Sequence, residues 1–232
     1  MAVAFIDYYG VLVYTLNLIL WIAPIKSMMN LYKSKDLWQV PYNFYMISLV
    51  NCLFWIVYGL QINIWPIWAV NIPGLLSFMG CIILYLFFIK MKTYEFVIMI
   101  IALPFKTSLI FFIFYYYVDQ EINGYIAMSA NILMFIMPSE QIYHVVKSKN
   151  NVYIELWLAI AIFINSSAYF VYGILLGHNW DIIIPNGLGF CIAISQLVVW
   201  YKYRVPTDYQ KVDKIEIHDN DNELSEINTS ID

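Results

Sequence analysis

The chain has 232 residues, of which 62% are apolar, 19% aromatic and 12% charged. A soluble domain usually carries about a quarter charged residues, so this composition argues against an ordinary soluble domain and indicates a protein that has lipid as its solvent. The formal net charge of -4 arises from an acidic tail, residues 206–232, which we expect to be disordered and cytoplasmic, and it gives no sign of a nucleic-acid partner.

Seven apolar segments are each long enough to cross a bilayer, which takes about 20 residues in a helix. The first is a span rather than a cleavable signal peptide, because no basic region precedes it and no clean cleavage site follows it. The connections between the segments are short. The predicted spans are 8–29, 41–61, 66–89, 94–118, 123–146, 153–176 and 181–203.

Basic residues follow every second span. The connections 62–65, 119–122 and 177–180 contain no Lys or Arg. By the positive-inside rule the N-terminus lies outside and the C-terminus in the cytoplasm. The basic residues that carry this pattern are Lys26, Lys33, Lys35, Lys90, Lys92, Lys147, Lys149, Lys202 and Arg204.

The chain contains an internal repeat. The segment 21-WIAPIKSMMNLYKSKD-36 matches 135-FIMPSEQIYHVVKSKN-150, and the same offset of 114 relates Asn51 to Asn165 and Tyr58 to Tyr172. Shared apolarity alone does not produce such agreement at constant spacing.

The repeat predicts the fold class. We expect an all-α membrane protein with seven transmembrane helices, arranged as two parallel three-helix bundles, residues 8–92 and 121–205, joined by a linker helix over 93–120 (3+1+3). Because three spans are an odd number, the linker helix restores the orientation of the second copy. In transporters the substrate site lies at the interface between such repeats, near the middle of the membrane.

At these residues the chain resembles the SWEET family of sugar facilitators, whose repeat is shared with PQ-loop transporters. The resemblance covers about residues 8–204 and is sharpest in 54-FWIVYG-59, 169-YFVYG-173 and 184-IPNGLGF-190. It implies a passive, bidirectional sugar uniporter that works by alternating access. It also implies a multi-pass protein, most often of the plasma membrane although an internal membrane is an alternative, that associates as a homo-oligomer, often a trimer.

The resemblance implies that Asn71 and Asn186 bind sugar, and an amide supplies donors and acceptors for neighbouring hydroxyls. Trp55 and Tyr169 occupy matching positions where an aromatic ring packs against a sugar; the family usually carries Trp at the second position. Asn51 and Asn165, one turn earlier on the same helices, are candidate pocket walls. The alternatives are asparagines that join helices and aromatics that anchor them at the interface.

Hinges are implied at Pro24, Pro41 and Pro138, which match three of the four helix prolines of the family; static kinks are the alternative. At the position of the fourth family proline this chain has Glu155, in the first turn of the sixth span. This residue is either a solvated carboxylate favoured by the helix N-terminus or a group that couples transport to protons.

An extracellular gate is implied at the outer ends of the second and sixth spans. Tyr58 and Tyr172 lie there, and Asp181 could close the gate through a hydrogen bond. An extra residue in the preceding loop leaves Asn179 as the competing position.

Two other classes of protein fit less well. We expect no enzyme, cofactor or metal site, because the spans contain no cluster of catalytic or metal-binding residues and the three cysteines lie singly in apolar segments. A seven-span receptor is disfavoured by the repeat and the short loops. The main alternative is a PQ-loop-type carrier of amino acids or another small metabolite, which Lys106, Glu140 and Glu155 would favour if the cargo is charged or proton-coupled.

Overall fold

The computed structural model describes residues 2–21, 29, 32, 42–89 and 92–204. The predicted prolines Pro24 and Pro41 and the tail 206–232 lie outside the described residues. Within the described ranges every element is helical, as the sequence predicted. The elements are α1 (Ala2–Leu20), α3 (Tyr42–Gln61), α4 (Trp65–Phe88), α5 (Thr93–Tyr117), α6 (Gln120–Met134), α7 (Ile136–Ser148), the 3-10 turn η2 (Asn151–Tyr153), α8 (Leu156–Leu175) and α9 (Trp180–Lys202).

The predicted seven-helix arrangement is confirmed. In the described part of the chain, six helical segments are long and apolar enough to cross a membrane, with α6 and α7 counted as one segment. The seventh, α1, is apolar from Phe5 to Leu20 and begins six residues before the predicted first span. The other predicted spans agree with the helices to within a few residues.

The fifth span is interrupted near Pro138. α6 ends at Met134 and α7 begins at Ile136, so Pro138 lies in the first turn of α7. Proline has no backbone N–H, so the carbonyl of Met134 lacks its usual helical donor. At the same point the amide of Phe135 bonds to the carbonyl three residues earlier, Ile132 O, at 3.1 Å, and this bond tightens the end of α6.

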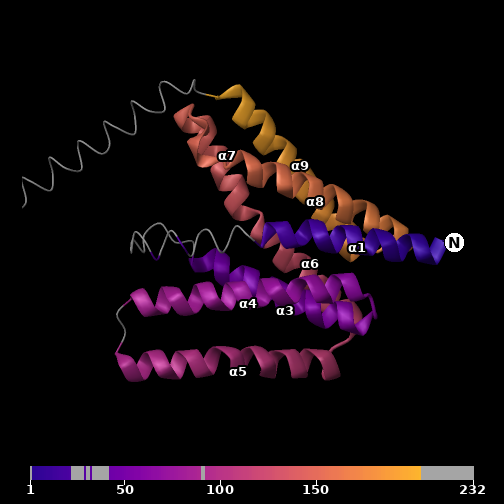
Figure 1. The fold of residues 1–232 in the computed structure, drawn as a ribbon, viewed down its shortest axis with the longest axis vertical. Helices are drawn as coiled ribbons and strands as arrows, with labels where there is room; N and C mark the ends of the chain where they lie inside the picture. Colours follow the sequence, from indigo (N-terminus) through magenta and orange to yellow (C-terminus); the bar gives the residue numbers. More distant parts are fainter. Residues whose placement is uncertain (1, 22–28, 30–31, 33–41, 90–91, 205–232) are drawn as a thin grey trace, which may run out of the picture.

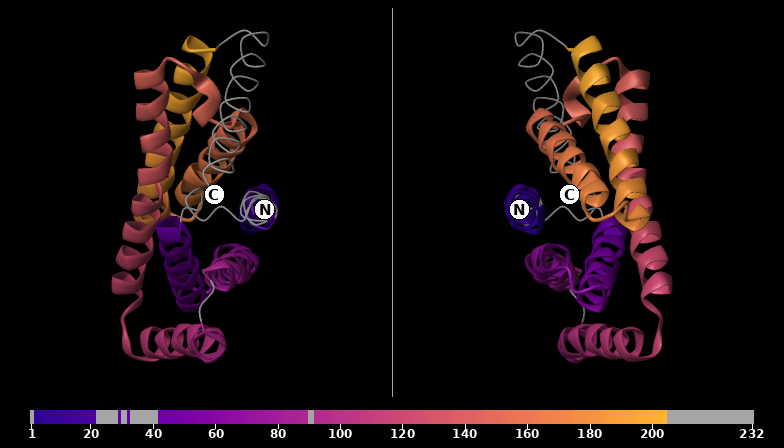
Figure 2. Two further views of the ribbon diagram at one scale, coloured as in Figure 1. Left: turned by 90° about the vertical axis from the view of Figure 1, so that its left-hand side faces the viewer. Right: turned by 90° about the vertical axis from the view of Figure 1, so that its right-hand side faces the viewer.

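The two repeats pack with the same pattern of contacts. α3 packs along α4 in the first repeat, and α8 packs along α9 in the second. α1 lies against α8, and α6 lies against α3, so the first helix of each repeat contacts the second helix of the other (Figures 1 and 2). The linker helix α5 lies outside α3 and α4 (Figure 1). Its last turn meets the start of α6, where Asn123 Nδ2 donates to Phe114 O at 3.0 Å.

Among the described residues, one apolar core joins the two repeats, and it lies at one end of the molecule. Near the ends of α3 and α8, a single core contains Trp55 and Tyr58 of the first repeat with Tyr169 and Tyr172 of the second. Toward the other end each repeat has its own core, one on α3 and α4 and one on α7, α8 and α9. The repeats diverge in that direction (Figure 1). We call the end with the shared core the closed end, and the end where the repeats diverge the open end.

Candidate functional site

A cavity of about 590 Å³ lies between the two repeats. Its lining runs from Trp55 and Tyr169, which belong to the joined core, to Tyr153 and Glu155, which are exposed at the open end. The volume is in the range of small-molecule sites. Among the described residues no three His, Cys, Asp or Glu side chains form a group that could hold a metal ion.

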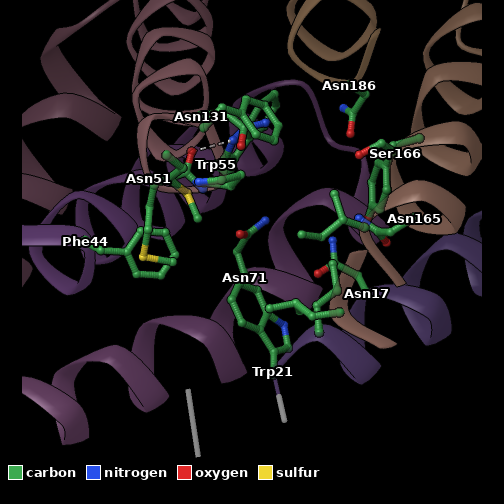
Figure 3. Close-up of a pocket in the computed structure, with 18 of the residues that line it drawn as sticks. Asn17, Trp21, Phe44, Asn51, Trp55, Asn71, Asn131, Asn165, Ser166 and Asn186 are labelled. Atoms are coloured by element: carbon green, nitrogen blue, oxygen red, sulfur yellow. Dashed lines mark hydrogen bonds between the residues drawn. The ribbon is translucent and has the colours of Figure 1, made fainter. Parts of the chain in front are cut away.

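The lining of this pocket contains six asparagines among the described residues, in three pairs related by the repeat. Two pairs are among the predicted site residues, and the structure brings these together with Trp55 and Tyr169 in one pocket (Figure 3). The third pair was not predicted, although its members are also 114 positions apart. The pairs are Asn71 and Asn186, Asn51 and Asn165, and Asn17 and Asn131.

The amides of Asn71 and Asn186 are held in the same way. Asn71 Nδ2 donates to Ile67 O at 2.7 Å, and Asn186 Nδ2 donates to Ile182 O at 2.8 Å. Both acceptors belong to the same helix as the donor, so these bonds do not join neighbouring helices. Figure 3 shows both amides directed into the space between the repeats. Each amide therefore keeps an oxygen and one N–H for a ligand.

The aromatic positions differ between the repeats in their hydrogen bonds. On α3, Trp55 Nε1 donates to Asn51 Oδ1 at 3.1 Å. On α8, Asn165 Oδ1 and the Tyr169 hydroxyl are buried and have no hydrogen-bond partner among the described residues. The Asn17 amide lies close to this hydroxyl but outside hydrogen-bonding geometry. In the described part of the chain, the second repeat therefore encloses two unpaired oxygens at a position where the first repeat has a hydrogen bond.

At the closed end the predicted contact between Tyr58 and Asp181 is present. The Tyr58 hydroxyl donates to Asp181 Oδ2 at 2.8 Å and accepts a bond from Asn179 Nδ2 at 2.8 Å. Asn179 Oδ1 also accepts from the amide of Ile182 at 3.2 Å and so caps α9. Both of the competing residues, the N-cap and a first-turn residue of α9, thus bind the same tyrosine.

Gly124 on α6 leaves room for this contact. A Cβ atom at residue 124 would lie 2.6 Å from Asp181 Oδ2 and 3.0 Å from Tyr58 Cε2. Real Cβ atoms do not approach so closely, so any side chain there would push these two residues apart.

The repeat-related contact on the other side has no hydrogen bond. Pro66 takes the place of Asp181 and offers no side-chain acceptor, and a Cβ at Gly10 would lie 2.8 Å from its ring. The Tyr172 hydroxyl has no hydrogen bond within the described part of the chain, and its ring stacks on Tyr9 at 6.1 Å. The tyrosine hydroxyl is therefore hydrogen-bonded at only one of the two symmetric positions among the described residues; on the other side Tyr9 of α1 donates to Ala168 O of α8 at 3.2 Å.

The charged residues considered from the sequence lie at the rim of the pocket or outside it. Glu155 directly precedes α8, is exposed, and accepts a bond from Trp157 Nε1 at 2.7 Å. Lys106 is exposed on α5 and does not line the pocket. Glu140 lies 3.5 Å from His144 on α7. The structure thus gives no support for a charged site built on Lys106.

Two helical repeats around a pocket that is closed at one end and open at the other define a multi-pass integral membrane transporter. A family model described as "Sugar efflux transporter for intercellular exchange" matches residues 7–93 and 121–208. The chain therefore belongs to this family, the MtN3/SWEET family, as its motifs indicated.

Individual relatives agree with this assignment. The chain is 27% identical over 222 residues to "Bidirectional sugar transporter SWEET8" of Arabidopsis thaliana, covering 88% of this chain and 90% of the relative. It is 28% identical over 195 residues to "Bidirectional sugar transporter SWEET2a" of Oryza sativa subsp. japonica, covering 81% and 80%. These relatives are named as transporters and not as enzymes.

A solved structure has the same fold. A eukaryotic SWEET transporter superposes with a TM-score of 0.73 at 23% sequence identity, covering 85% of this chain and 96% of the other. The all-α arrangement of two three-helix repeats and a linker helix is thereby confirmed.

Proposed function

We propose that this protein is a facilitative, bidirectional carrier of small sugars that works by alternating access. The observation that carries the proposal is an uncharged, amide-lined pocket between the repeats. Glu155, at the rim, is the one charged side chain among the described residues that line it. Amide groups and aromatic rings suit a neutral ligand with many hydroxyls. The family membership and the names of the relatives support the same cargo.

In this proposal Asn71 and Asn186 bind hydroxyl groups of the sugar, since their free amide atoms face the pocket. Trp55 and Tyr169 pack against the sugar ring. Four further asparagines form the pocket wall: Asn51, Asn165, Asn17 and Asn131.

The proposed units are residues 8–92 and 121–205, with 93–120 as the linker and 206–232 as a cytoplasmic tail. The distribution of basic residues supports an extracellular N-terminus. The pocket then faces the cytoplasm, and the contact between Tyr58 and Asp181 closes the extracellular side. The resemblance supports a homo-oligomer, with the trimer as the expected form, and residence in the plasma membrane.

Transport through this pocket requires the core at the closed end to separate while the open end closes. The repeats share one core at the closed end, so separation exposes Trp55 and Tyr169 to the other side. Pro138 is the proposed hinge among the described residues, because the break between α6 and α7 lets α7 swing while α6 stays packed against α3. Tyr172 completes the proposed gate on the other side, where its ring stacks on Tyr9.

A carrier of amino acids remains the alternative function, but it needs charged partners for an ammonium and a carboxylate. The depth of the pocket offers none among the described residues. Glu155 is exposed and bonded to Trp157, which is the geometry of a solvated carboxylate at a helix N-terminus. A neutral cargo therefore fits the pocket better than a charged or proton-linked one.

Uptake of labelled compounds by cells that lack their own hexose carriers tests the proposal. We expect saturable uptake of at least one neutral monosaccharide, well above that of cells with empty vector, and no increase for amino acids. The Asn71→Ala, Asn186→Ala double variant is the inactive control. Amino-acid uptake without any sugar uptake would contradict the proposed function.

A further inference from the structure

Side-chain amides tie the linker helix α5 to both repeats at the closed end. Asn123, in the first turn of α6, is fully buried, and its Nδ2 donates to Oε1 of Gln61, the last residue of α3, at 2.9 Å. Asn123 Nδ2 also donates to Phe114 O at 3.0 Å and to Val118 O at 3.2 Å. Gln61 Nε2 donates to Tyr115 O at 3.1 Å and to Val118 O at 2.9 Å. We call these two amides, with the last carbonyls of α5, the linker joint.

The linker joint is costly to break. The last carbonyls of a helix have no donor within the helix, so other groups have to satisfy them. Here the amides of Gln61 and Asn123 do so for the end of α5. Moving α6 away from α3 would leave these carbonyls and the buried amide of Asn123 without partners, and an unpaired buried polar group carries its full desolvation cost. The start of α6 is therefore held on α3.

The repeat-related contact, between α1 and α8, lacks such a joint among the described residues. The offset of 114 places Tyr9 and Leu175 at the positions of Asn123 and Gln61. The Tyr9 hydroxyl donates to Ala168 O at 3.2 Å. That carbonyl lies inside α8, where the amide four residues further along the helix supplies its donor. Separation of α1 from α8 therefore leaves no helix-end carbonyl unpaired.

These two contacts lie at opposite edges of the interface between the repeats. α6 lies against α3 at one edge, and α1 lies against α8 at the other (Figure 2). The bonds of Tyr58 run from α3 to Asn179 and Asp181 at the start of α9. They break when α9 moves away from α3, even if α6 stays in place.

We propose that the linker joint stays closed throughout the transport cycle and acts as its pivot, so that the closed end opens on the side of α1 and α8. This inference rests on the proposed transport by alternating access. Gln61 and Asn123 are then positioning residues, which hold the start of α6 on α3 while α8 and α9 move. Two symmetric repeats thus open on one side only.

The test compares two cysteine pairs in a protein whose native cysteines have been replaced. Ile62→Cys with Asp119→Cys lies beside the linker joint. Phe5→Cys with Leu176→Cys lies at the repeat-related positions, 114 residues away in each case, beside the contact of Tyr9. Each pair is bridged in proteoliposomes by a bifunctional thiol reagent that a reductant cleaves, and mass spectrometry verifies the bridge. The readout is the initial rate of labelled-glucose uptake.

Bridging residues 62 and 119 should leave uptake within about twofold of the unbridged protein, because this contact does not move. Bridging residues 5 and 176 should lower uptake at least about tenfold, because it holds one state, and the reductant should restore it. Loss of uptake on bridging residues 62 and 119, or full uptake after bridging residues 5 and 176, would overturn the pivot.

Asn123→Ala, made in the pair at residues 62 and 119, tests the joint itself. It should lower uptake at least about threefold before bridging, because the start of α6 is no longer held. The bridge should then restore uptake, which it could not do for a protein that is merely misfolded. Unchanged uptake in the unbridged variant would overturn the role of Asn123, and the comparison of the two bridges does not depend on this variant. Absence of any monosaccharide uptake by the wild type would overturn the proposed function, whereas a wrong response to bridging overturns the pivot alone.

Discussion

Sugar flux through Asn186→Ala, and equally through Asn71→Ala, is expected to fall at least about 30-fold. Each amide has an oxygen and one N–H available to the ligand after its bond to its own helix. Loss of two buried hydrogen bonds to a ligand, each worth about 1 kcal/mol or more, corresponds to a reduction of this order. The measurement is the initial rate of uptake into proteoliposomes that contain equal amounts of each protein.

The control for this prediction is Ser195→Ala on the same helix. Ser195 is exposed, does not line the pocket, and bonds to Cys191 O within α9 at 2.9 Å. This variant should transport at the wild-type rate. Wild-type flux through Asn186→Ala, with membrane insertion verified, would show that the asparagine pair does not form the site.

Tyr58→Phe is expected to open the closed end. The substitution removes both the bond to Asp181 and the bond from Asn179, and it leaves the carboxylate without its phenolic donor. Hydrogen bonds to charged groups contribute about 1.5–3 kcal/mol, so the population with this end open should rise at least about tenfold. The readout is labelling of Ile182→Cys, in the joined core, by a membrane-impermeant thiol reagent added outside cells.

The matched control is Tyr172→Phe, since this hydroxyl makes no hydrogen bond within the described residues. Both variants are made in a protein whose three native cysteines have been replaced, so that the reagent can label only residue 182. These cysteines are Cys52, Cys81 and Cys191. Tyr172→Phe should label at the wild-type rate, whereas Tyr58→Phe should label faster. Equal labelling of the two would mean that the hydrogen bonds of Tyr58 do not hold this end closed.

Much of the fold could be predicted from the sequence because apolar length and an internal repeat are local signals. The interruption of the fifth span follows from Pro138, since proline lacks the backbone donor that a helix interior requires. The third asparagine pair, Asn17 and Asn131, also obeys the repeat. This pair lies four residues before Trp21 and Phe135, outside the two segments whose residues match clearly, so the match of those segments does not point to it.

The hydrogen bonds within the site could not be predicted. Asn51 and Asn165 align in sequence, yet among the described residues only the first is bonded to its aromatic neighbour. Both rings carry a donor, but the indole N–H and the phenolic O–H lie at different places on the ring. From the sequence, Asp181 and Asn179 were alternative partners for the gate, whereas in the structure Tyr58 contacts both. Such contacts depend on how the loop of one repeat lies over the helix of the other.

Counterflow in proteoliposomes tests most directly whether a sugar passes through the pocket by alternating access. Vesicles are loaded with unlabelled sugar, diluted into medium with a trace of labelled sugar, and sampled over time without any ion gradient. A carrier that exposes one site to each side in turn should accumulate the label transiently above its equilibrium level and then lose it. Label that only equilibrates, at the rate of protein-free vesicles, or that accumulates only when a proton gradient is imposed would contradict a passive sugar carrier.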